Sequence, residues 1–262
     1  MQSKVSDAWL DLRNGLRMWR IWMAFAKEDI GEQHKRTTLG PLWLLVNYLA
    51  FAGTFIFLFD RGHGTANYPA HVAIGLMVWF FIMEALTQGV NLFSREESFI
   101  KGTSLPLTIY IMRLTLQCAI RGGYAMIGCL AILIATGTPF SLSSGWSIVG
   151  IAIVLATAPA AITLVALLGA YIPDSQFLVS NAMRIGMFLT PVFWTHEASG
   201  GARAFFYYWN PFTYFLEIVR QPVVNGEPAW EALWISLSMC VGIWAFAIFF
   251  FTRLRREVVF VL

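Results

Sequence analysis

Residues 146–172 read WSIVGIAIVLATAPAAITLVALLGAYI and contain no charged side chain. About 20 apolar residues in a helix cross the hydrocarbon core of a membrane, so this run predicts a transmembrane helix. The rest of the chain agrees, because 58% of its 262 residues are hydrophobic and only 13% are charged, about half the charge of a soluble domain. A soluble core of this length cannot bury so much apolar surface. The sequence therefore predicts a polytopic membrane protein.

The same length test finds further spans and predicts an all-α fold in one domain that covers residues 1–262. The six predicted transmembrane helices cover approximately residues 42–59, 71–93, 108–136, 146–172, 179–194 and 230–251. Residues 195–229 hold prolines, glycines and aromatic residues, with two helix-like runs that are too short to span. We expect a re-entrant or interfacial hairpin there, on the outer side.

Basic residues predict the orientation of these spans. With both termini inside, the inner segments carry thirteen Lys and Arg residues and the outer segments carry three. Cytoplasmic segments are enriched in Lys and Arg, so both termini are expected in the cytoplasm. No secretory signal is visible before the first span. The net charge of +3 gives no case for nucleic acid, and the basic residues are better suited to acidic lipid head groups.

Residues 5–27 predict an amphipathic helix that lies on the cytoplasmic membrane surface. Its apolar residues recur at spacings of three and four, and they are Trp9, Leu12, Leu16, Trp19, Met23 and Ala26. A second face carries Arg13, Arg17 and Arg20. Such a helix is too charged to span but suits the head-group region. The helix is interpreted either as a simple membrane anchor or as an element with a mechanical role.

The sequence holds no motif for nucleotide or metal chemistry. A P-loop ends in Gly-Lys-Ser/Thr, and none of the four lysines follows a glycine. The cysteines Cys118, Cys129 and Cys240 lie far apart in apolar runs, which makes a disulfide or zinc site improbable. His34 belongs to the connector, and His63, His71 and His196 are expected in outer loops, so the histidines predict no site. If the chain is a pump, another polypeptide must supply the energy.

The connector between the surface helix and the first span carries the motifs KEDI at residues 27–30, QHKR at 33–36 and TLGPLW at 38–43. In these residues the chain resembles the membrane subunits of bacterial ABC-2 type polysaccharide exporters, which export O-antigen, capsule and teichoic-acid chains. SFIK at residues 98–101 is similar to the helix of such exporters that touches the ATPase. TPVF at residues 190–193 is similar to the end of their fifth span, and NPFTY at residues 210–214 is similar to their outer hairpin.

This resemblance implies a permease subunit without enzymatic activity. It would pair with a second copy of itself and with two nucleotide-binding subunits that bind ATP and Mg²⁺. The expected substrate is a lipid-linked polysaccharide, and the expected location is the bacterial inner membrane. The expected ATPase contacts are Arg95, Glu96, Phe99, Ile100 and Lys101. Two alternatives stay open: a permease for a smaller amphiphile, such as a drug or lipid, and a membrane-embedded glycan-modifying enzyme.

Two sets of residues are candidates for a translocation path. One is an aromatic stripe on the first span formed by Tyr48, Phe51, Phe55 and Phe59, whose ring faces could stack on sugars. The other is three intramembrane charges, Glu84, Arg121 and Arg184. Charges inside a membrane are costly unless they are paired or wetted. They are therefore interpreted either as the lining of a path or as structural ion pairs, and the stripe either as a path or as a lipid-facing surface.

Two further clusters each allow alternative roles. Arg13, Arg17, Arg20, Lys35 and Arg36 are predicted to form a cytoplasmic gate that contacts lipid phosphates, because these side chains bind phosphate strongly. The competing interpretation is that Lys35 and Arg36 only keep the amino end inside. The aromatic residues 205–209 (FFYYW) on the outer side predict either an interfacial belt or the rim of a channel.

Overall fold

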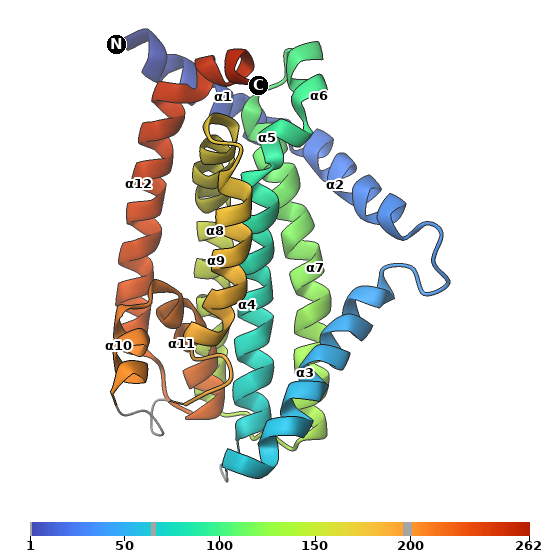
Figure 1. Cartoon of the computed structure of the whole chain (residues 1–262), viewed down its shortest axis with the longest axis vertical. Coiled ribbons are helices and arrows are strands. Elements are labelled where there is room, and N and C mark those ends of the chain that lie inside the picture. The colour runs from blue at the N-terminus through green and yellow to red at the C-terminus, as the bar shows by residue number, and fades with distance from the viewer. Residues whose placement is uncertain (1, 64–66, 196–200) are drawn as a thin grey trace.

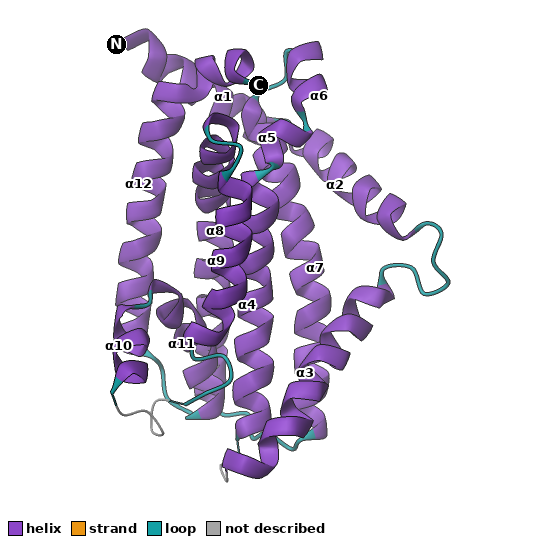
Figure 2. Cartoon of the chain, in the orientation of Figure 1, coloured by secondary structure: helices purple, strands orange, loops and turns teal. Residues whose placement is uncertain are grey.

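The computed structural model of the chain describes residues 2–63, 67–195 and 201–262. These residues form helices, turns and loops only (Figure 2). The six predicted spans correspond to α3 (Leu42–His63), α4 (Tyr68–Val90), α7 (Leu107–Ala135), α8 (Trp146–Tyr171), α9 (Ser175–Leu189) and α12 (Trp230–Val261). Their predicted boundaries are close to the observed ones, with two exceptions. Helix α9 begins four residues earlier and ends five residues earlier than predicted, and α12 continues for ten residues beyond residue 251.

Five of these helices are long and apolar enough to cross a membrane, within the residues described. The exception is α9, which has 15 residues. At about 1.5 Å per residue it is roughly 22 Å long, shorter than the ~30 Å hydrocarbon core. The number of helices that meet the length test is therefore one fewer than the sequence predicted.

Both chain ends lie at the same end of the bundle (Figure 1). This end also carries α1 (Gln2–Arg17), α5 (Leu92–Arg95) and α6 (Glu97–Gly102). The opposite end carries α10 (Ala202–Trp209) and α11 (Pro211–Val224), which follow one another at Asn210. A short 3₁₀ helix, η1 (Leu142–Gly145), precedes α8.

The core of the bundle depends on close contacts between α8 and its neighbours. A Cβ atom added to Gly169 of α8 would lie 1.7 Å from the carbonyl oxygen of Val90, and one added to Gly150 would lie 2.7 Å from that of Ile218. Small residues at such contacts let helix backbones approach each other, which is how helices associate in membranes. Pro159 lies within α8, and the Thr163 hydroxyl donates to its carbonyl oxygen at 2.7 Å. Helices α4, α8 and α11 therefore form a tightly packed block.

The amphipathic segment is two helices rather than the single helix predicted over residues 5–27. The chain bends at Met18, and α2 (Trp19–His34) then slants away from the end of the bundle (Figure 1). Each helix has its own attachment to α7. Asp11 of α1 contacts Leu107 and Thr108 at the start of α7, whereas Asp29 of α2 contacts Arg113 further along it. The two attachments give the helices different directions.

Candidate functional site

An open cavity of about 720 Å³ lies between α2, α3, α4 and α7. Its walls combine aromatic rings with polar groups. Four residues of the predicted path meet here, Tyr48, Phe51, Glu84 and Arg121. The other polar residues that line it are Gln33, Asn47, Thr87 and Gln88. We refer to this space as the central cavity.

The Glu84 carboxylate and the Arg121 guanidinium form an ion pair on the wall of the central cavity. The second terminal nitrogen of Arg121 donates to the Gln33 side-chain oxygen at 2.8 Å. This arrangement joins α4, α7 and the last turn of α2. The pair therefore has features of both interpretations made from the sequence: it ties helices together, and it presents polar groups to a cavity.

The aromatic stripe forms ring contacts from Phe51 through Phe55 to Phe59, whereas Tyr48 contacts Phe80. Phe51 lines the cavity and packs against Phe80, with ring centroids 5.2 Å apart. Phe55 stacks on Phe193 at 4.2 Å. Tyr48 is buried at the edge of the cavity, where its hydroxyl donates to the carbonyl oxygen of Ala73 at 2.7 Å. Tyr48 therefore contributes to the packing of α3 against α4 as well as to the wall.

The remaining path candidates lie outside the central cavity. Phe59 stacks on Phe55 at 6.0 Å and is exposed. Arg184 is exposed on α9 and does not line the cavity. Of the two intramembrane arginines named from the sequence, Arg121 is the one that pairs with Glu84.

The predicted ATPase contacts divide into an outward and an inward group. Phe99 on α6 is 60% exposed, and Lys101 beside it pairs with Glu97 at 2.6 Å on the surface. By contrast, Ile100 is packed in the chain's own core and Glu96 is buried. Ile100 therefore does not offer an apolar anchor to another protein, and Phe99 is the exposed apolar group of this segment.

Glu96 belongs to an ionic network that the sequence did not predict. Arg113 of α7 donates to both oxygens of Asp29 in α2, at 2.6 and 2.7 Å, and to Glu96 at 3.0 Å. Gln117 also donates to Asp29. Bidentate pairs of this kind are strong and geometrically specific. Asp29 belongs to the KEDI motif, which was the available signal, while nothing in the sequence paired it with Arg113. The network joins α2, α7 and the segment between α5 and α6.

Arg95, the fifth predicted ATPase contact, lies on the same segment and faces two partners. It donates to the side chain of Gln88 at 3.1 Å and approaches Glu96 at 3.4 Å. Gln88 lines the central cavity. A chain of polar contacts therefore runs from the α5–α6 segment to the cavity.

A second missed group is Asp11, whose side chain is buried at the start of α7. It accepts hydrogen bonds from the backbone N–H groups of Leu107 and Thr108, at 3.2 and 3.1 Å, and from the Thr108 hydroxyl at 2.7 Å. Arg255 of α12 pairs with it at 2.9 Å. The first N–H groups of a helix lack partners within the helix and favour negative charge. Asp11, which belongs to α1, accepts hydrogen bonds from these N–H groups and places a negative charge at the start of α7.

The predicted gate residues are accessible. Arg13, Arg17 and Arg20 are exposed on α1 and α2, and Lys35 and Arg36 are exposed in the connector. Arg20 lies over the ring of its neighbour Trp19 at 5.5 Å. They are free to contact groups outside the chain.

A buried polar cluster joins α11 to α4. His71, which the sequence assigned to an outer loop, is buried in α4, and Arg220 is buried in α11. Arg220 pairs with Glu217 and lies 2.9 Å from the His71 ring nitrogen, and it donates to the carbonyl oxygen of Pro191 at 2.5 Å. Burial, with the Glu217 carboxylate as the next cause, raises the pKa of Tyr207. The cluster fixes α11 to α4 and to the end of α9.

The predicted aromatic cluster at residues 205–209 lies mainly on the surface of α10. Trp209 is 76% exposed and Phe205 and Tyr208 are also exposed. Both the belt and the rim remain compatible with this placement.

The other histidines take no part in these clusters as far as the structure describes them. His196 and the side chains of His34 and His63 lie outside the described parts. Among the described residues, no group of three or more His, Cys, Asp or Glu side chains is placed to hold a metal ion.

These features define a helical membrane protein with a polar and aromatic cavity and an ionic connection to its surface helices. Residues 17–224 match the ABC-2 type transporter family, and the chain belongs to that family as a membrane permease. Two relatives are both O-antigen export system permease proteins RfbA of Klebsiella pneumoniae. They are 21% and 22% identical to the chain, over 86% of its length and over 88% and 87% of their own.

Proposed function

We propose that the chain is the membrane subunit of an ATP-driven exporter of a polysaccharide such as O-antigen or capsule, in lipid-linked form. The observation that carries this proposal is the central cavity, in which Phe51 and Phe80 lie beside the Glu84–Arg121 pair. Aromatic rings stack on sugar rings without selecting one hydroxyl pattern, and amide and charged groups exchange hydrogen bonds with hydroxyls. The names of the Klebsiella relatives agree with such a substrate.

The assembly that fits this function is a homodimer with two ATPase subunits that bind ATP and Mg²⁺. One chain has few helices with which to surround a glycan, so a second copy would complete the path. The exposed ring of Phe99 suits an apolar groove on the ATPase, because buried aromatic side chains dominate the binding energy of many protein interfaces.

The proposed topology places the polysaccharide path in the bacterial inner membrane with both termini in the cytoplasm. The shared position of the chain ends and the bias of thirteen to three basic residues support it. In this orientation α9 makes the sixth crossing together with the turn after it. Helices α10 and α11 form the re-entrant outer hairpin, whose broken backbone is shielded by α4, α8 and α12.

The contacts of α2 suggest how motion would pass from the ATPase to the cavity. A displacement of α6 would act on Glu96, and through Arg113 on Asp29 of α2. The last turn of α2 carries Gln33, which contacts Arg121 at the cavity wall. In this proposal α1 and α2 act as the cytoplasmic gate, while Arg13, Arg17, Arg20, Lys35 and Arg36 contact phosphates of lipids or of the substrate carrier.

Export of a smaller amphiphile is the competing function, and one experiment separates the two. The chain is purified with an affinity tag from its own bacterium, and a co-purifying soluble P-loop ATPase is identified. Depletion of the chain should then remove a glycan from the cell surface and leave its lipid-linked form inside. A normal surface glycan, with loss of resistance to a drug or with a changed lipid distribution, would overturn the polysaccharide proposal in favour of the smaller substrate.

A further inference from the structure

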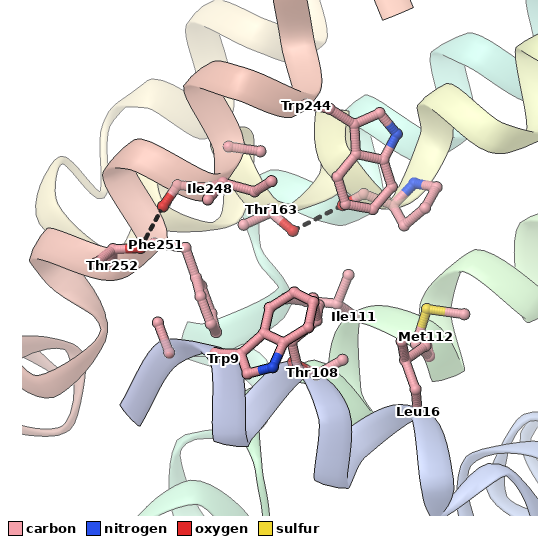
Figure 3. A pocket seen from close by; sticks show the side chains of 14 residues that line it. Trp9, Leu16, Thr108, Ile111, Met112, Thr163, Trp244, Ile248, Phe251 and Thr252 are labelled. Carbon is pink, nitrogen blue, oxygen red and sulfur yellow. Dashed lines mark hydrogen bonds between the residues drawn. The ribbon is translucent and has the colours of Figure 1, made fainter. Parts of the chain in front are cut away.

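A second cavity, smaller and apolar, lies beside α1 at the end of the bundle that carries both termini. It has a volume of about 190 Å³ and is bounded by α1, α7, α8 and α12. Figure 3 shows Trp9 of α1 on one side, with Phe251 and Trp244 of α12 across from it. The cavity shares no lining residue with the central cavity. It is therefore a separate site, and the function proposed above does not use it.

Most polar groups in its wall have partners within the protein. The hydroxyl of Thr163 donates to the carbonyl oxygen of Pro159 at 2.7 Å, and that of Thr252 donates to the carbonyl oxygen of Ile248 at 2.6 Å (Figure 3). The indole of Trp244 donates to a backbone oxygen at 2.9 Å, and the Thr108 hydroxyl donates to Asp11 at 2.7 Å. Apart from these paired groups and the indole of Trp9 the wall is apolar, so the site resembles the apolar cavities of ~150 Å³ that bind small hydrocarbons. Such a lining favours a hydrocarbon ligand.

The rim of the cavity is apolar on the side that opens to the surroundings. Trp9 is 64% exposed and Ile248 is 54% exposed, although both line the cavity. Helix α12 is one of the helices that are long and apolar enough to cross a membrane. At membrane depth the hydrocarbon available to such an opening is a lipid acyl chain.

Positive charge adjoins this opening. Arg13 follows Trp9 by four residues and precedes Leu16 by three, so it lies beside both on the surface of α1. Arg17 lies one turn further along, and both arginines are exposed. A helix with this composition attracts anionic lipids, by about 1 kcal/mol for each basic residue near the surface. The apolar cavity suits the acyl chain of an anionic phospholipid, and the exposed arginines beside it suit the phosphate.

We infer that the cavity holds one acyl chain of an anionic phospholipid, whose phosphate binds Arg13 and Arg17. The lipid comes from the leaflet at the end of the bundle that carries the termini, which is cytoplasmic in the orientation proposed above. An acyl chain that contacts both α1 and α12 holds the surface helix α1 against the bundle on its lipid-facing side. The occupant is a membrane lipid rather than the transported molecule, because the site is separate from the central cavity and has room for only part of one chain.

The test uses the purified chain in vesicles that contain phosphatidylglycerol with a photoactivatable diazirine in one acyl chain. After illumination, mass spectrometry locates the labelled peptides, which should come from α1 and α12. The variant Ala247→Phe fills the cavity from its wall, where Ala247 is buried. Its labelling should fall about tenfold, the effect of losing roughly two buried methylene groups. The matched control Ala245→Phe adds the same ring at an exposed position of α12 and should keep wild-type labelling.

Two further arms complete the test. If Ala247→Phe does not fold, Ile248→Trp narrows the half-exposed rim and should lower labelling in the same way. The double variant Arg13→Gln/Arg17→Gln should lose the preference for phosphatidylglycerol over phosphatidylcholine.

Two results would overturn the inference. They are equal labelling in Ala247→Phe and Ala245→Phe, or displacement of the label by a lipid-linked glycan. Labelling needs neither an ATPase nor export, so its failure leaves the proposed function intact, and failure of the proposed function leaves the lipid site intact.

Discussion

The guanidinium of Arg113 in α7 binds Asp29 in α2 through two hydrogen bonds of 2.6 and 2.7 Å, and through a third it reaches Glu96 at the end of α5. One side chain thus joins the surface helix, a membrane-spanning helix and the segment proposed to meet the ATPase. Removing one partner of such a group leaves a charge without its counterpart, which is more damaging than replacing both.

Asp29→Asn should uncouple ATP hydrolysis from export. The variant loses the ionic partner of Arg113 while keeping its shape, so ATPase activity of the assembled complex should persist and export should fall at least about tenfold. Both quantities are measured in proteoliposomes. Glu28→Gln removes a neighbouring carboxylate that is exposed on α2 and should behave as wild type. Equal losses in the two variants would argue against a role for the Asp29–Arg113 pair.

Replacing the charges of the Glu84–Arg121 pair should affect the stability of the protein and its export activity in different ways. Glu84→Gln or Arg121→Gln alone leaves an uncompensated charge and should lower the melting temperature in detergent. The double variant restores electrical balance and should regain most of that stability. Export should stay low in the double variant if the pair lines the path. Recovered export would instead identify a purely structural ion pair.

Phe99→Asp should prevent binding of the ATPase without unfolding the chain, because the ring is exposed. Loss of one central aromatic anchor costs about 2 kcal/mol or more, a factor of roughly 30 in affinity. Pull-down of the ATPase measures the effect. Phe140→Asp, at an exposed aromatic residue near the other end of α7, is the control. Ile100→Asp should instead destabilise the permease itself, since Ile100 is in the core.

Asp11→Ala should lower the free energy of unfolding by about 2 to 4 kcal/mol. The change removes a cap from α7, worth typically ~1 kcal/mol, and leaves the partly buried Arg255 without its buried partner. Asp7→Ala removes a carboxylate that pairs with Arg256 near the surface, and such pairs contribute less than about 1 kcal/mol. Thermal unfolding in detergent measures the loss of stability in each of the two variants. A loss in Asp7→Ala as large as that in Asp11→Ala would contradict the capping role.

A cysteine added after Leu262 should react with thiol reagents only after the cells are opened. The reason is the excess of basic residues in the inner segments. The experiment is clean because Cys118, Cys129 and Cys240 are buried. Labelling of intact cells by an impermeant reagent would reverse the proposed orientation.

The sequence predicted those parts of the fold that depend on local composition. Uninterrupted apolar runs located α3, α4, α7 and α8 to within a few residues, because the length of a membrane helix is set by the bilayer. Residues 5–27 were harder, since periodicity shows an apolar face but not a bend. The bend at Met18 lies between Asp11 and Asp29, which attach to different parts of α7. The end of α12 was missed for the same reason: Arg255 and Arg256 continue the helix toward distant aspartates.

The candidate site was predictable where a residue type is unusual for its surroundings. A carboxylate and an arginine inside apolar runs identified Glu84 and Arg121, and the aromatic spacing identified Phe51. The ionic network at Arg113 was not found, because Asp29 lies 84 positions away in the chain and surface charges are common. His71 was misplaced because α4 starts earlier than residue 71, at Tyr68, so that the histidine lies in the helix.

The contact between Asp11 and Arg255 has a consequence for biosynthesis. In the order of synthesis, Asp11 in α1 precedes the start of α7, and Arg255 in α12 comes after both. The start of α7 can be capped as soon as that helix inserts, but the carboxylate that caps it lacks its arginine until α12 has been made. The end of the bundle that carries α1 therefore closes only after synthesis of α12, and a protein shortened before Arg255 would insert its earlier helices without the contact that joins α1 to α12.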